Sequence, residues 1–111
     1  MDKYNLGVIQ SGFSKTVLYD NTINSVGTYA LSDSVHNYKL IIVEHGCVRD
    51  NNNCKQSNVI VGIYNDNKAY IVCHGNGGDV NHTVFHFSVD GNNVIIDEVN
   101  GENITKIVGI N

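Results

Sequence analysis

Apolar side chains recur at every second position along most of this chain, and no stretch shows the 3.6-residue spacing of an amphipathic helix. The run 38–45 is apolar on both of its alternating faces in the middle, as expected for a central strand of a sandwich. In the run 83–89, alternation places Phe85 and Phe87 on one face, which we expect to point into the core. Shorter runs of the same kind lie at 16–19 and 28–31.

Asparagine and glycine separate these runs, and both residues tolerate the positive φ angles of tight turns. The runs 59–64 and 68–74 are joined by Asn65, Asp66 and Asn67, which predicts a hairpin with a three-residue loop. The runs 83–89 and 94–99 are joined by a polar turn at 90–93, which predicts a second hairpin. A final strand is expected at 104–110.

About eight short strands at near-regular spacing predict an all-β fold, a single antiparallel β-sandwich or jelly-roll-like domain. A chain of 111 residues suits one domain with a core of its own. Only the start of the chain lacks the alternating pattern. We therefore expect an N-terminal arm or connecting segment over residues 1–15 and the β-sandwich domain over residues 16–111.

Composition narrows the classes of partner. The chain is 41% hydrophobic and 16% charged with a net charge of −4, which favours a folded protein over a disordered one. The seven Lys and Arg residues are scattered singly, so we expect no nucleic-acid partner. No apolar run approaches the roughly 20 residues of a membrane helix, and the first residues lack a signal-peptide layout, so we expect a soluble protein without membrane insertion.

Three cysteines, an odd number, argue against a closed disulfide framework and suit synthesis in a reducing cytoplasm. Cys47 and Cys54 flank a polar loop, and the sequence leaves open whether they pair. Together with His45 they also suggest a zinc site or a thiol enzyme. A cysteine nucleophile needs a base within hydrogen-bond reach and a third group to orient that base. His45 lies two residues from Cys47 and could share its strand face, but Gly46 and the polar loop beside them are typical of a strand end. We expect no enzyme.

The segment 73–82 places two imidazoles, a thiol and a carboxylate around a glycine-rich loop. It reads either as a mobile loop with solvated histidines or as a recognition loop held by rigid strands. Saccharide binding requires planar amides, carboxylates and an aromatic face, and this chain has amides in excess. The ligand-binding residues that we predict are Tyr64, Asn65, Tyr70, His74, Asn76, Asp79, Asn81 and His82.

Two further arrangements bear on chemistry. His74, His82 and His86 fall within one hairpin-sized window, but no spacing matches a structural zinc signature, so they are weak metal candidates and we expect no cofactor. Asp97 and Glu98, with Asp79 as a further candidate, suggest the carboxylate pair of a glycosidase. Strict alternation would send these neighbours to opposite faces of a sheet, which disfavours that reaction.

Three stretches resemble the C-terminal domains of bacteriophage tail-fibre and baseplate proteins. They are an L-Y-x-N opening at 18–21, an L-S-x-S segment at 31–34 followed by the run Y-K-L-I-I-V at 38–43, where such domains have Y-x-x-L-x-I, and an I-T-K-I-x-G ending at 104–109. Val108 and Ile110 depart from that pattern, in which aromatic residues are expected. The resemblance implies a homotrimeric β-rich tip in the virion tail, which recognises a receptor on the host bacterium. A host surface glycan is the partner that we expect.

Two alternatives remain open at this point. The domain could be a structural trimerisation or assembly domain of a tail fibre that binds no ligand. It could also be a small metal-binding β-domain, and within a trimer His86 could complete a metal site from three chains.

Overall fold

The computed structural model describes residues 14–47, 57–63, 68–74 and 80–111 of the chain. Strand dominates these residues, and their only helical element is the 3-10 turn η1 (Val35–Asn37). None of the described segments forms a helix long and apolar enough to cross a membrane. The strands are β1 (Lys15–Tyr19), β2 (Gly27–Ala30), β3 (Leu40–Cys47), β4 (Ser57–Val61), β5 (Ala69–His74), β6 (Val80–Phe87), β7 (Asn93–Asn100) and β8 (Glu102–Ile110).

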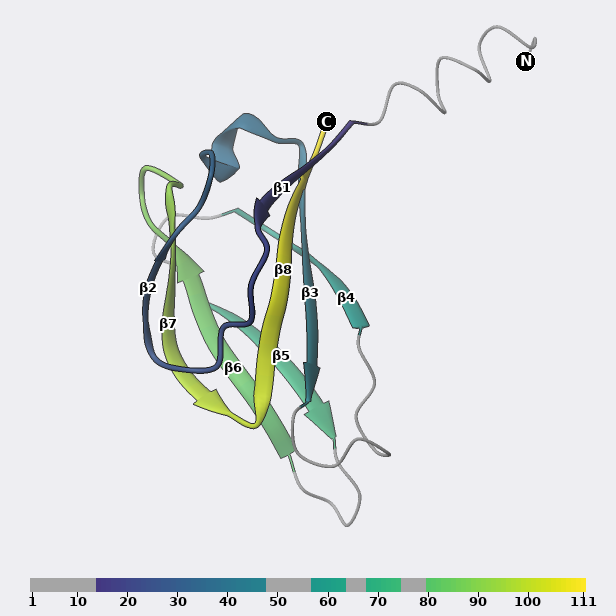
Figure 1. Ribbon diagram of the computed structural model, residues 1–111, viewed down its shortest axis with the longest axis vertical. Helices are drawn as coiled ribbons and strands as arrows, with labels where there is room; N and C mark the ends of the chain where they lie inside the picture. The colour runs from purple at the N-terminus through teal and green to yellow at the C-terminus, as the bar shows by residue number, and fades with distance from the viewer. Residues whose placement is uncertain (1–13, 48–56, 64–67, 75–79) are drawn as a thin grey trace, which may run out of the picture.

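The strands form two four-stranded antiparallel sheets, ordered β1-β8-β3-β4 and β2-β7-β6-β5. The sheets lie face to face (Figure 1), so each has an inner face on a shared core and an outer face turned away from it. This architecture confirms the predicted β-sandwich of eight strands.

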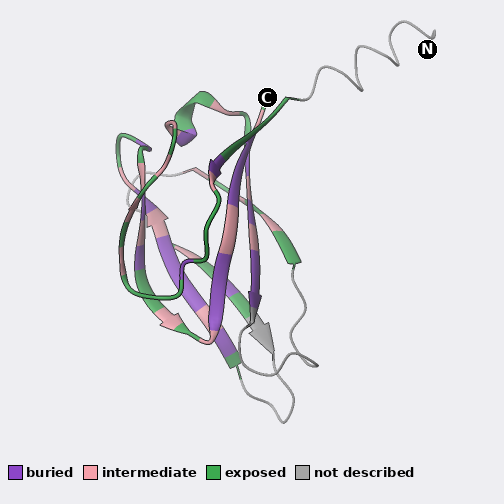
Figure 2. Cartoon of the chain, in the orientation of Figure 1, coloured by how far each residue is buried: buried purple, intermediate pink, exposed green. Residues whose placement is uncertain are grey.

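The core lies between the sheets and draws side chains from both of them. Phe85 is fully buried and Phe87 is 6% exposed, which confirms their predicted direction. From the other sheet, Ile41, Val43 and Ile107 are fully buried. Figure 2 shows that β3, β6 and β8 carry most of the buried positions. Each such side chain contributes about 1.5–3 kcal/mol to stability, so these three strands hold the sandwich together.

The predicted hairpin between residues 59–64 and 68–74 is wrong. Within the described residues, β4 pairs with β3, whereas β5 pairs with β6 in the opposite sheet. The connection therefore crosses from one sheet to the other. Each of the two strands has one apolar face that the core can bury, and a short polar loop is compatible with either path. The loop residues 65–67 lie outside the described residues.

The second predicted hairpin is confirmed, because β6 and β7 pair antiparallel. Its turn requires a glycine: Gly91 has φ of 75°, a left-handed conformation that side chains with a Cβ rarely adopt. The side chain of Ser34, which caps η1, donates a hydrogen bond to the backbone oxygen of Asp90 at 2.8 Å. The turn and η1 therefore brace each other at one end of the sandwich.

Candidate functional site

Three ion pairs between described residues lie on the outer face of the β2-β7-β6-β5 sheet. We call this surface the histidine face. Its contacting residues are Lys68, Tyr70, His82, His86, Asp97 and Glu98.

A β-bulge in β7 creates this surface. Val84 of β6 lies opposite Glu98 and Phe85 lies opposite Ile96, so one step along β6 corresponds to two steps along β7. Asp97 is the extra residue. Bulges redirect side chains in this way, and both acidic residues are exposed while the flanking Ile96 and Val99 face the core. The expectation that Asp97 and Glu98 point to opposite faces is therefore wrong.

Each carboxylate of the histidine face contacts an imidazole of β6. Glu98 Oε1 lies 3.0 Å from His82 Nε2, and Asp97 Oδ2 lies 3.0 Å from His86 Nδ1. Lys68 Nζ lies 3.5 Å from the same Asp97 oxygen, so this carboxylate sits between two nitrogen groups. These contacts orient the carboxylates, and each leaves oxygen lone pairs for a further partner.

Tyr70 adds an aromatic surface at the edge of the sheet. Tyr70 is 63% exposed, and the centroid of its ring lies 5.8 Å from that of the His82 ring, with the two ring planes tilted by 30°. Val84 lies directly between Tyr70 and Glu98 in the cross-strand register. Because strands are spaced at about 4.8 Å, the backbones of Tyr70 and Glu98 are about 10 Å apart. An aromatic ring and a carboxylate therefore border an apolar floor at Val84.

Part of this surface was predictable from the sequence. Of the predicted ligand-binding residues, the structure brings Tyr70 and His82 into contact. Asn81 alternates with His82 and is only 1% exposed, so its side chain lies inside the sandwich. Tyr64, Asn65, Asn76 and Asp79 lie outside the described residues, as does the side chain of His74, whose backbone ends β5.

Sequence reasoning missed Lys68 and the convergence of Asp97 and Glu98. A signal for the bulge was present: two polar residues stand between the apolar Ile96 and Val99, which interrupts the period of two.

Two of the weak metal candidates, His82 and His86, do not come together, and the side chain of the third, His74, lies outside the described residues. Val84 separates His82 from His86 along β6, and four strand residues span about 13 Å, which is too far for one ion. Among the described residues, no group of three His, Cys, Asp or Glu side chains could hold a metal ion.

A second polar group lies inside the sandwich. His45 Nδ1 lies 2.6 Å from Glu102 Oε1, and the two residues are 8% and 0% exposed. The Thr83 hydroxyl donates a hydrogen bond to the backbone carbonyl of Glu102. The His45 ring therefore faces the core and contacts Glu102. Cys54, which the sequence analysis grouped with it, lies outside the described residues, as does the side chain of Cys47.

Comparison of the chain with models of protein families, with curated proteins and with solved structures gave no match.

Proposed function

We propose that this chain is a saccharide-binding domain of a phage tail-fibre or baseplate tip, and that the histidine face contacts the host glycan. The observation that carries the proposal is the exposed Tyr70 ring beside a carboxylate held by an imidazole. The motifs at 18–21, 31–34 and 104–109 support the tail-fibre context through their resemblance to such domains.

The chemistry of the histidine face suits a sugar ring. The C–H groups on one face of a sugar pack on an aromatic ring, and Tyr70 offers its ring to solvent at the sheet edge. Sugar hydroxyls donate hydrogen bonds to carboxylates, and Glu98 keeps 54% of its side chain exposed while contacting His82. Both groups stand on strands, whose hydrogen-bonded neighbours fix their spacing.

The charge pattern of the histidine face disfavours polyanionic ligands such as nucleic acids. Asp97 and Glu98 place two carboxylates at its centre, and Lys68 is the only Lys or Arg that contacts this set among the described residues. A phosphate backbone would meet negative charge there. A neutral or amine-bearing glycan fits the face better.

The test is binding to a glycan array and to cell walls from candidate hosts, with three proteins compared. Tyr70→Ala removes the aromatic surface and should weaken binding by about tenfold or more, because exposed tyrosines at binding surfaces are frequent hot spots. Val26→Ala is the matched control. Val26 is 65% exposed just before β2, the edge strand on the far side of the sheet from β5, so its truncation should leave binding unchanged.

Two results would overturn the proposal. If Tyr70→Ala binds as well as the unaltered protein, the glycan contacts another surface. If the unaltered protein binds no saccharide while forming a stable oligomer, the assembly-domain alternative is correct. The homotrimer implied by the resemblance stays a separate prediction, and the mass of the native oligomer distinguishes it from the two-fold dimer proposed below.

A further inference from the structure

The outer face of the β1-β8-β3-β4 sheet is apolar at its centre, in contrast to the charged histidine face of the other sheet. One cross-strand row consists of four β-branched apolar residues, Val17, Val108, Ile42 and Ile60, one from each strand of the β1-β8-β3-β4 sheet. Val17 and Ile60 are 40% and 64% exposed, and Leu40 in the next row is 41% exposed. We call this surface the Val108 face. Val108 at the centre of the row is only 2% exposed and forms the floor of this surface. Exposed apolar side chains that gather around one sheet face in this way indicate a contact surface.

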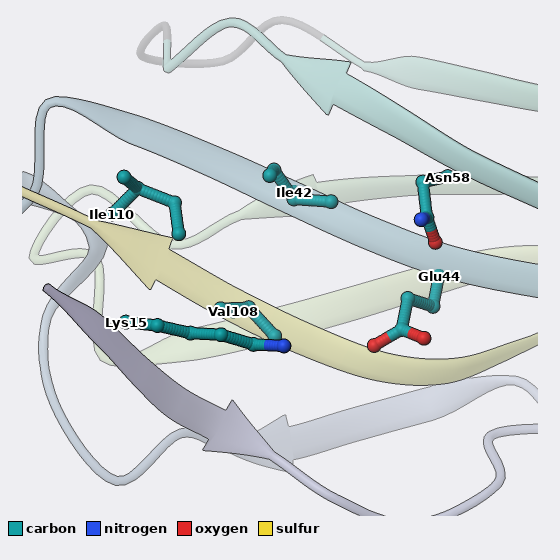
Figure 3. A pocket seen from close by; sticks show the side chains of 6 residues that line it. All are labelled: Lys15, Ile42, Glu44, Asn58, Val108 and Ile110. Atoms are coloured by element: carbon teal, nitrogen blue, oxygen red, sulfur yellow. The ribbon is translucent and has the colours of Figure 1, made fainter. Parts of the chain in front are cut away.

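Charge borders the Val108 face at two opposite corners. A hollow of about 150 Å³ is lined by Lys15 and Glu44 together with Ile42, Val108, Ile110 and Asn58. Figure 3 shows the Lys15 side chain beside Val108 and the Glu44 carboxylate farther along the hollow. Among the described residues, Lys15 and Glu44 form no ion pair with each other or with another side chain.

The strand register relates these two corners through Val108. Lys15 is on β1 opposite Ile110, one strand away from Val108 and two residues toward the chain end. Glu44 is on β3 opposite Lys106, one strand away on the other side and two residues in the other direction. The two charges are therefore displaced equally and oppositely from Val108. A two-fold axis that runs parallel to the sheet over Val108, perpendicular to the line from Lys15 to Glu44, packs two copies face to face and places Lys15 of one over Glu44 of the other.

We propose that the Val108 face binds a second copy of this chain through such a two-fold axis. Lys15 of each copy then meets Glu44 of the other, and Val108 lies on the axis. The same operation places Leu40 of one copy near Ile60 of the other, so two of the most exposed apolar side chains of the face cover each other. The strands of the two packed sheets would cross at a steep angle, nearer to the orthogonal class of sheet packing than to the aligned one.

A two-fold contact is self-complementary, which makes it testable with charge swaps. The unaltered protein should have twice the 12.2 kDa mass of the chain by light scattering and native mass spectrometry. Lys15→Glu gives two acidic corners and Glu44→Lys gives two basic corners. In each variant alone, like charges meet across the contact, so the dissociation constant of the dimer should rise about tenfold or more.

Mixing the two single variants is the decisive step. A Lys15→Glu copy beside a Glu44→Lys copy has both contacts attractive, so the mixture should recover the dimer mass as a heterodimer. An ion pair within one chain could not be restored by mixing. Lys68→Glu, which changes the charge of the opposite sheet face, is the matched control and should remain dimeric.

Three results would overturn this inference. They are a monomeric mass at all concentrations, a trimeric mass, and single charge swaps that leave the dimer as stable as before. Binding of glycan through the histidine face does not depend on the Val108 face, so failure here leaves the proposed function standing.

Discussion

The imidazole of His45 and the carboxylate of Glu102 lie 2.6 Å apart between the two sheets, with Glu102 fully buried. A charged or polar group in such a place is stable only with its partner present, because burial removes the water that would otherwise solvate it. The pair also joins β3 to β8, the two strands with the longest shared register in the sandwich.

Removing one member of this pair should therefore destabilise the fold strongly. We expect Glu102→Ala to lower the free energy of unfolding by about 3–5 kcal/mol, the usual cost of breaking a buried pair from one side. Urea unfolding followed by circular dichroism measures it. Glu98→Ala removes a carboxylate from an exposed histidine pair and should cost no more than about 1 kcal/mol. Equal losses for the two variants would contradict the inference that the buried His45–Glu102 pair stabilises the fold more than the exposed His82–Glu98 pair.

The turn at Gly91 should tolerate no side chain. An added Cβ would lie 2.5 Å from Ser34 Oγ and 2.8 Å from a carbon of the His36 ring. Gly91→Ala should therefore lower the free energy of unfolding by about 1–3 kcal/mol, through backbone strain and this crowding together. Gly91→Asn separates the causes, because asparagine tolerates the left-handed region. Full recovery with asparagine would show that crowding against η1 is absent.

Acid should weaken the corner around η1. Hydrogen bonds from Tyr38 Oη, the Ser34 backbone N–H and the Asn37 side chain lower the pKa of Asp33 below its usual 3.8. A lowered pKa in the folded state stabilises the fold above the unfolded-state pKa, and this contribution is lost as pH falls through the folded-state pKa. Asp90, bonded by Ser88 and Asn92, has a lowered pKa and acts in the same direction.

The measurement is the urea midpoint from neutral pH to below pH 3.8. The unaltered protein should lose stability below that value. Tyr38→Phe removes the largest cause of the Asp33 shift, so its carboxyl should titrate nearer the usual pKa by NMR, and the acid loss should be shallower. An unchanged Asp33 titration in Tyr38→Phe would refute this explanation.

Deleting Asp97 should regularise β7. Without the bulged residue, the order Ile96, Glu98, Val99 again alternates between core, outer face and core. We expect a loss of about 1 kcal/mol, typical of a change that leaves no cavity. His82 should keep its carboxylate neighbour and His86 should lose its own, which the imidazole NMR signals report. Deletion of Ile96, which is 1% exposed, is the control and should unfold the domain.

Much of the fold could be predicted from the alternation of apolar residues. The prediction that failed concerned which strands pair, which depends on contacts between distant parts of the chain. The pattern predicted the positions of the strands and the inward direction of Phe85 and Phe87, because a strand that buries one face carries apolar residues at every second position. It did not say that β4 and β5 belong to different sheets, since both have an apolar face and either sheet could bury it. The partner of a strand depends on residues far away in the chain.

The candidate site was predictable in the same measure. Tyr70 and His82 stood out by residue type, but their contact depends on diagonal neighbours in paired strands, which the sequence alone does not specify. The carboxylates were misassigned because the period of two was applied through a bulge. Glu102 gave no signal, because nothing in the sequence distinguishes a buried glutamate in a strand from an exposed one.

The position of β8 has a consequence for how the chain is made. This strand comes last among the described elements, yet it lies between β1 and β3 and pairs with both. During synthesis on the ribosome, β1 and β3 must therefore wait with unpaired edges until residues 102–110 emerge, and only then can the first sheet close. Native pairing of this kind is slow and exposes strand edges meanwhile, so a chain interrupted before β8 should aggregate rather than fold.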